Sequence, residues 1–181
     1  MTKKKFPSIK EVCERRPFRH GDEVFDLSHL DAHIVEYENP NAGPPPYYKF
    51  YVTYGCHCFT TSRPDKHSLG DFHAPKESRP FCRSRYEYSK HLPYLVNSLG
   101  DEGARCYHAG VSRYATINLT LEGGETIDYF MVFKTFRERR KLRLHVESAY
   151  TLDAPPGKLK KIKFAVIAYN TLMGKTIRQP E

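Results

Sequence analysis

The sequence lacks the motifs that mark the commonest enzyme classes. It has no P-loop, no Gly-x-Gly-x-x-Gly fingerprint, no Gly-x-Ser-x-Gly elbow and no His-Glu-x-x-His pair. ATP use, Rossmann-type cofactors and the common hydrolase and zinc-protease chemistries therefore find no support, and we assign no cofactor.

Long apolar segments are also missing. No apolar run approaches the roughly 18 residues of a membrane-spanning helix. The lysine-rich residues 1–5 lack the apolar core of a secretion signal. We therefore expect no membrane partner and a cytoplasmic location.

Cysteine is scarce, and its count of five is odd. Reduced thiols in a cytosol explain an odd count most simply. Enough zinc ligands stand between residues 56 and 82, namely Cys56, His57, Cys58, His67, His73 and Cys82. The spacing argues against zinc, because there is no C-x-x-C pair and a strand would point His57 away from Cys56 and Cys58. We therefore assign no metal ligand, and keep a Cys/His metal-binding module as a second alternative.

The sequence is rich in positive charge and in Tyr and Phe residues. It carries 29 Lys and Arg against 21 Asp and Glu, a net charge of +8, with 13 Tyr, 11 Phe and no Trp. Tyr and Phe favour strands, so a large sheet is expected. Excess positive charge attracts polyanions, of which nucleic acid is the commonest.

The hydrophobic pattern of the 181 residues predicts a single α+β domain. We expect an antiparallel sheet of about five strands, packed by one long helix at 79–99, which Pro93 would kink or divide into two consecutive helices, and a C-terminal helix at 159–173. A strand fits residues 162–168 about as well as a helix. Residues 1–20 read as a tail and a short helix that starts at a Ser8 capping box, and residues 60–78 as a long polar loop. The strand candidates are 33–37, 47–59, 105–108, 114–121, 126–134 and 142–150.

The strand candidate at 142–150 carries the candidate catalytic residues. Its apolar positions alternate with Arg143, His145 and Glu147, which would share the opposite face. Such a face could cleave RNA without a metal, because RNA carries its own nucleophile. Glu147 or His145 would take a proton, His145 would supply one, and Arg143 would hold the phosphate. The alternative is a solvated strand face with cross-strand ion pairs.

Basic residues around this strand and elsewhere are the candidate nucleic-acid contacts. They are Lys134, Arg137, Arg139, Arg140, Lys141, Lys158, Lys160, Lys161, Lys163, Arg83 and Arg85. If they form one patch, binding should weaken steeply with salt.

These observations lead us to expect a basic, RNA-directed protein, with DNA as the second choice, and a possible metal-independent endoribonuclease. The expected architecture resembles the small ribonuclease toxins of the RelE kind, although none of their motifs is present. The first alternative is a non-enzymatic adaptor or inhibitor that docks an acidic protein partner.

Overall fold

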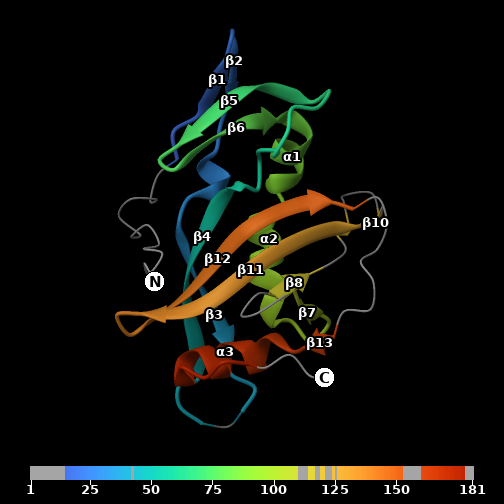
Figure 1. The fold of residues 1–181 in the computed structure, drawn as a ribbon. Helices are drawn as coiled ribbons and strands as arrows, with labels where there is room; N and C mark the ends of the chain where they lie inside the picture. The colour runs from blue at the N-terminus through green and yellow to red at the C-terminus, as the bar shows by residue number, and fades with distance from the viewer. Residues whose placement is uncertain are drawn as a thin grey trace.

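A seven-stranded sheet forms the centre of the structure (Figure 1). The structure is a computed structural model that describes residues 15–41, 43–109, 114–116, 119–120, 124, 126–152 and 160–177. In sheet order the strands are β13 (Lys161–Ile162), β7 (Cys106–His108), β8 (Tyr114–Thr116), β11 (Tyr129–Glu138), β12 (Lys141–Thr151), β4 (Tyr47–His57) and β3 (His33–Glu38). The chain is one small α+β domain, as the sequence predicts.

Shorter elements surround this sheet. Three two-stranded pairs are β1 (Phe18–His20) with β2 (Glu23–Phe25), β5 (Ser68–Ala74) with β6 (Glu77–Cys82), and β9 (Leu119–Thr120) with β10 (Thr126–Ile127). The helices are α1 (Arg83–Ser89), α2 (Leu92–Asn97) and α3 (Phe164–Met173), with 3₁₀ turns η2 (Ser28–Leu30) and η3 (Ser98–Gly100). The β1–β2 and β5–β6 hairpins lie at one end of the molecule and α3 at the other (Figure 1).

The large sheet is mixed, whereas the sequence predicted an antiparallel one. β12 pairs with β4 in parallel, and the other pairs of this sheet are antiparallel. A parallel neighbour requires a long crossover, here the chain between β4 and β12. Alternating residues define the two faces of a strand but do not identify its neighbours, so the sequence could not reveal this pairing.

The apolar face of β12 packs in the core as its alternation predicts. Leu144 stands opposite Val52 of β4, and Val146 opposite Tyr54, and all four side chains are buried. Buried residues of the three helices join the same core, including Phe164, whose ring contacts three other core rings. The helices therefore cover this face of the sheet, and its burial supplies the main driving force for folding.

Two segments differ from their predicted form. Residues 60–78, expected to be a loop, contain β5 and the start of β6, a hairpin whose many polar residues hid its strands. Residues 79–82 complete β6, and two short helices follow. Proline is tolerated in the first turn of a helix but not in its interior, so Pro93 begins a second helix, α2, instead of continuing α1. The Ser8 capping box lies outside the described residues, and Phe18–His20 form a strand.

The C-terminal ambiguity is resolved in favour of a helix. β13 occupies two residues, and α3 follows and ends at Gly174, whose φ of +66° suits the glycine C-cap. Among the helices in the described ranges, none is long and apolar enough to cross a bilayer.

Candidate functional site

The chain turns sharply where β4 ends, and this turn positions Cys56 and His57. The backbone N–H groups of Phe59 and Thr60 both donate to the Cys56 carbonyl, at 3.1 and 3.0 Å, and the Thr60 hydroxyl donates to it at 2.8 Å. Cys58 consequently leaves the strand, and its buried thiol points toward the Val146 carbonyl. The prediction that the side chains of Cys56 and Cys58 share one face of a strand is therefore wrong.

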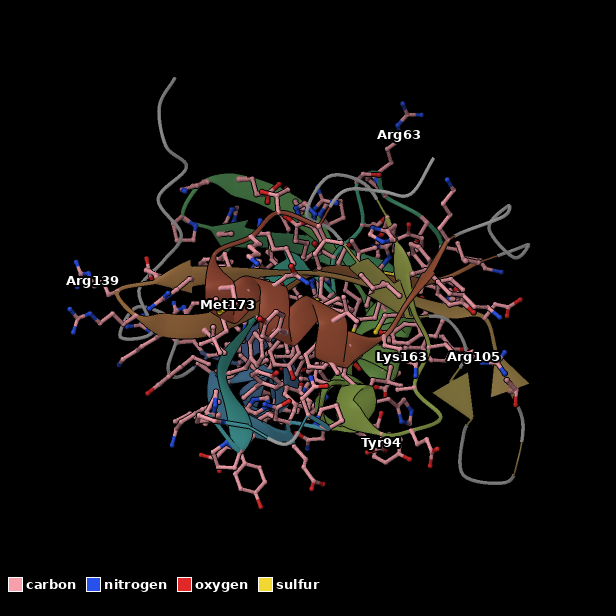
Figure 2. All side chains as sticks on the ribbon, turned by 90° about the horizontal axis from the view of Figure 1, so that it is seen from below. Arg63, Tyr94, Arg105, Arg139, Lys163 and Met173 are labelled. Atoms are coloured by element: carbon pink, nitrogen blue, oxygen red, sulfur yellow. The ribbon has the colours of Figure 1, made fainter. Side chains whose placement is uncertain are left out.

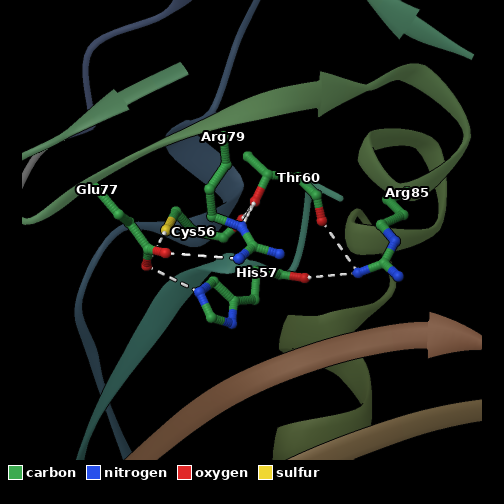
Figure 3. Close-up of polar contacts among 6 residues, drawn as sticks. All are labelled: Cys56, His57, Thr60, Glu77, Arg79 and Arg85. Carbon is green, nitrogen blue, oxygen red and sulfur yellow. Dashed lines mark hydrogen bonds and ion pairs between the residues drawn. The ribbon is translucent and has the colours of Figure 1, made fainter. Parts of the chain in front are cut away.

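The β5–β6 hairpin brings a carboxylate to this turn. Two backbone hydrogen bonds join the hairpin to the turn, Thr61 N–H to Pro80 and Cys82 N–H to Phe59, at 2.9 and 3.0 Å. Glu77, the first residue of β6, then reaches the end of β4 (Figure 3). We call Cys56, His57 and Glu77 the strand-end cluster.

A single carboxylate oxygen holds the cluster together. Oε1 of Glu77 lies 2.8 Å from Nε2 of His57 and 3.6 Å from Sγ of Cys56 (Figure 3). The other oxygen, Oε2 of Glu77, lies 3.4 Å from Nη1 of Arg79. Thus one oxygen meets the sulfur and the imidazole, and the other is oriented by a guanidinium.

Two arginines fix the surrounding turn. Arg85 donates from Nη1 to the carbonyls of His57 and Thr60, at 3.2 and 3.0 Å. Arg79 donates from Nε to the Thr60 hydroxyl at 3.0 Å (Figure 3). Guanidinium groups that bind backbone carbonyls lock loop geometry, so the cluster sits on a supported frame.

The electrostatics of the cluster keep its thiol protonated. Burial raises the pKa of Cys56 to about 11, and the neighbouring Glu77 carboxylate adds to the rise. Burial alone would raise the pKa of Glu77, but the hydrogen bond from His57 and the charges of His57 and Arg79 lower it below its usual value. Cys56 is therefore a poor nucleophile until something replaces its proton.

The three side chains have the chemistry and the access of a metal site. Thiolate, imidazole and carboxylate are the zinc ligands of proteins. Their ligand atoms lie within 4.8 Å of one another, and in the described part of the chain this is the one such group of three or more. Solvent reaches it, since the side chains of His57 and Glu77 are 39% and 41% exposed.

The predicted catalytic residues stand on β12, the strand beside β4, and are not members of the strand-end cluster. Arg143 is only 4% exposed and pairs with Glu138 at 3.5 Å, and Glu147 pairs with Lys134. His145 shares a hydrogen bond of 2.9 Å with the Thr53 hydroxyl. Burial, followed by the charge of Lys134, lowers the pKa of His145 to about 4, so the imidazole is neutral at pH 7. The two ion pairs fit the cross-strand pairs of the alternative, whereas the burial of Arg143 and His145 does not fit its solvated face.

The predicted nucleic-acid contacts do not form one patch. Arg83 pairs with Glu23 near the β1–β2 hairpin, and Arg85 is committed to the turn carbonyls. Arg139 and Lys163 lie well apart in Figure 2. Lys134, Arg137, Arg139, Arg140 and Lys141 belong to the β11–β12 hairpin, Lys160, Lys161 and Lys163 precede α3, and Lys158 lies outside the described residues.

The fold and the cluster together define a small α+β protein with a Cys/His/Glu constellation at a strand end. The chain belongs to the YjaZ family, whose model matches residues 17–172. It is 45% identical to Protein YjaZ of Escherichia coli (strain K12) over 179 residues, which cover 94% of this chain and 98% of that protein. No solved structure matches the chain.

This membership corrects the predicted function. The descriptions of the family and of its Escherichia coli member name neither nucleic-acid binding nor nuclease activity. The basic residues, moreover, are divided among several places. The expectation of an RNA-directed protein or a metal-independent endoribonuclease is therefore wrong. The roles assigned to Arg143, His145 and Glu147 fall with that activity, and whether these residues meet a ligand of another kind stays a prediction.

The sequence alone identified two residues of the strand-end cluster and missed the third, Glu77, which contacts both. Cys56 and His57 were among the possible zinc ligands, but Glu77 was not, because nothing in the sequence reveals that the hairpin folds back onto β4. His73 instead bonds the Ser78 hydroxyl at 2.9 Å, and Cys82 lies near Asp65 and Ser84. The ligand set of the predicted Cys/His module therefore does not assemble in the described part of the chain.

Proposed function

We propose that the chain binds one divalent transition-metal ion of the zinc class through Cys56, His57 and Glu77. The observation that carries the proposal is the convergence of three different zinc-ligating groups from two separate segments on one point. Nitrogen and sulfur ligands favour zinc and its neighbours over magnesium or calcium.

The surroundings of Glu77 support this assignment. A metal-bound carboxylate commonly uses one oxygen on the ion while a hydrogen bond orients the other. The two oxygens of Glu77 already differ in this way: Oε1 lies toward Cys56 and His57, and Oε2 lies toward Arg79. The ion would replace the thiol proton and the hydrogen bonds to Oε1, so little backbone movement is needed.

Three protein ligands leave one coordination position for water or a substrate. Structural zinc sites close all four positions with protein ligands, whereas catalytic sites keep one open. The exposure of His57 and Glu77 leaves that position accessible to solvent. The geometry therefore supports an open site, one that can activate a bound water or hold a small anion.

Zinc binding by the full-length chain tests the proposal. The metal-free protein is titrated with Zn²⁺ in competition with a chromogenic chelator, and a stoichiometry of one ion per chain is expected. Cys56→Ser and Glu77→Gln should each weaken binding by about 100-fold, because each removes a direct ligand. Co²⁺ loading should give a thiolate-to-metal absorption band that disappears in Cys56→Ser.

Matched substitutions supply the controls. Cys82→Ser and His73→Gln change the same residue types outside the cluster, and should leave both the zinc affinity and the Co²⁺ band unchanged. Absence of binding tighter than the micromolar range, or equal losses in the cluster and control variants, would refute the metal site.

A further inference from the structure

The outer side of α3 exposes an apolar stripe. Val166, Tyr169 and Met173 are 44%, 43% and 49% exposed, while Phe164 and Ile167 face the core. The spacing of three and four residues places the exposed side chains on one face of the helix. They extend over about 10 Å, two turns, at the end of the molecule far from the β1–β2 hairpin (Figures 1 and 2).

A cleft adjoins this stripe at the start of α3. It has a volume of about 130 Å³ and lies between Phe164 and Ala165 on one side and Tyr37 and Tyr48 on the other. Ala165, which lines the cleft, directly precedes Val166 of the stripe in the first turn of α3, so the stripe starts beside the cleft. A cleft this size admits one apolar side chain of a partner, and such anchors dominate the energy of many interfaces.

Positive charge lies at both ends of the stripe. Lys161 and Lys163 are exposed at its start, and Lys175 at its end. Within the described ranges these three lysines form no ion pair. Arg137 binds the Leu172 carbonyl at 3.1 Å, which attaches the β11–β12 hairpin to the last turn of α3.

Two features of this region cost stability, and within the described residues no ion pair of these side chains offsets that cost. Lysines at a helix start oppose the helix dipole, and the first turn of α3 holds no acid. Arg139 and Arg140 form the hairpin turn with φ of +47° and +65°, a conformation that favours glycine and asparagine. Contacts between these cations and negative charge on a partner would offset the cost in stability.

We propose that α3 and the tip of the β11–β12 hairpin form a docking surface for an acidic amphipathic segment of a partner protein. Apolar side chains of the segment would cover Val166, Tyr169 and Met173, with one in the cleft. Acidic residues at its two ends would meet Lys161 and Lys163 at one end, and Lys175 and the hairpin arginines at the other. A second copy of the chain is disfavoured as occupant, because two chains of net charge +8 repel each other.

A designed peptide tests the surface. The probe is a fluorescein-labelled helical 16-mer with Leu at positions i, i+3, i+4 and i+7 and Glu at most other positions. The full-length protein should bind it at least tenfold more tightly than two matched peptides, one with Lys for Glu and one with Ser for Leu. Equal binding of the three peptides would overturn the proposal.

Substitutions locate the binding. Val166→Asp and Lys163→Glu should each weaken binding of the Glu/Leu peptide at least tenfold, with circular dichroism unchanged and the thermal midpoint not lowered; Lys163→Glu should raise the midpoint slightly, because a carboxylate at the helix start suits the dipole. The matched controls are Val24→Asp, on a valine that is 53% exposed at the far end of the molecule, and Lys66→Glu, on an exposed loop lysine. Controls that weaken binding as much would refute the proposed place.

Vesicles distinguish a protein partner from a lipid surface. Large unilamellar vesicles of anionic phospholipid should not compete with the Glu/Leu peptide for the protein. If the protein binds the vesicles through Val166 and Lys163 and ignores the peptide, the surface serves a membrane and the proposal is wrong. All these measurements are made in EDTA, so their outcome is independent of the metal site.

Discussion

A Cβ atom on Gly55 would lie 2.8 Å from the main-chain carbonyl oxygen of Glu147. The two strands approach so closely because β4 carries an extra residue here. Tyr54 stands opposite Val146, and His57 opposite Ser148, so three steps along β4 match two along β12. This bulge interrupts the alternation of β4, which explains how the adjacent side chains of Cys56 and His57 both reach Glu77.

Replacing Gly55 by alanine should disturb both the fold and the cluster. The added methyl group meets backbone rather than a flexible side chain, so β4 must shift, at a cost of about 1–3 kcal/mol in the free energy of unfolding. Urea denaturation of the metal-free protein measures the loss, and the chelator titration should show weaker zinc binding. Gly103→Ala is the control, since a Cβ at Gly103 meets nothing within 4 Å. Equal stability of the two variants would contradict the close approach.

The fold class was predictable because it depends on local patterns. Alternation at 142–150 defined a strand with its apolar face inward, and β12 confirms it. Gly174 marked the end of the last helix correctly. The partners of each strand were not predictable, since the parallel pairing of β12 with β4 joins residues about 90 positions apart and leaves no local signal.

The candidate site was only half predictable for the same reason. Cys56 and His57 are neighbours in sequence, but regular alternation would separate them. A glycine inside a strand pattern, here Gly55, is a sign of a bulge, but it does not reveal which side chains the bulge brings together. Glu77 comes from a hairpin whose polar composition concealed it. A strand face that looked catalytic, with Arg143, His145 and Glu147, is instead largely occupied with contacts to its own neighbours.

Arg85 should matter more to stability than its neighbour Arg83. Arg85 binds two carbonyls of the turn through one nitrogen, whereas Arg83 makes a solvent-exposed ion pair with Glu23. We expect Arg85→Lys to lower the free energy of unfolding by about 1–2 kcal/mol, because a lysine is shorter and lacks the planar guanidinium that lies over the Tyr150 ring and holds Nη1 between the two carbonyls. Arg83→Lys should change it far less, because an ion pair in solvent contributes little to stability. Urea midpoints of the two variants check the order, and a reversed order would contradict the role of Arg85.

The β11–β12 turn should tolerate, and even prefer, a different dipeptide. Arg139 and Arg140 both adopt positive φ, the conformation of a two-residue hairpin turn in which Asn-Gly is favoured. The double substitution Arg139→Asn with Arg140→Gly should therefore raise the free energy of unfolding by about 1 kcal/mol. Thermal denaturation measures the change, with Arg139→Ser and Arg140→Ser together as a charge-matched control. A gain equal to that of the control would show that relief of charge, not of backbone conformation, is responsible.

His145 should make the protein less stable in mild acid. Its pKa is about 4 in the folded chain and about 6.5 in the unfolded chain, chiefly because burial disfavours the imidazolium. Between these values only the unfolded chain takes up the proton, so stability is full above pH 6.5 and falls as the pH drops toward 4. From pH 7 to 4.5 the loss from this group is about 2–3 kcal/mol. His145→Gln should remove that part of the pH dependence in urea titrations, whereas His67→Gln, in an exposed loop, should keep it.

Zinc affinity should rise with pH because the ion must displace the Cys56 proton. With a thiol pKa of about 11, Cys56 is almost wholly protonated in the free protein at neutral pH, whereas the metal-bound form is a thiolate. Each unit of pH between 6 and 8 should therefore lower the zinc Kd about tenfold through this group, with about one proton released per ion. Calorimetry in buffers of different ionisation enthalpy counts the proton. In Cys56→Ser the tenfold change of the zinc Kd per pH unit that comes from the thiol should disappear. In Cys82→Ser that change should remain. A slope as steep in Cys56→Ser as in the parent protein would show that the thiol is not a ligand.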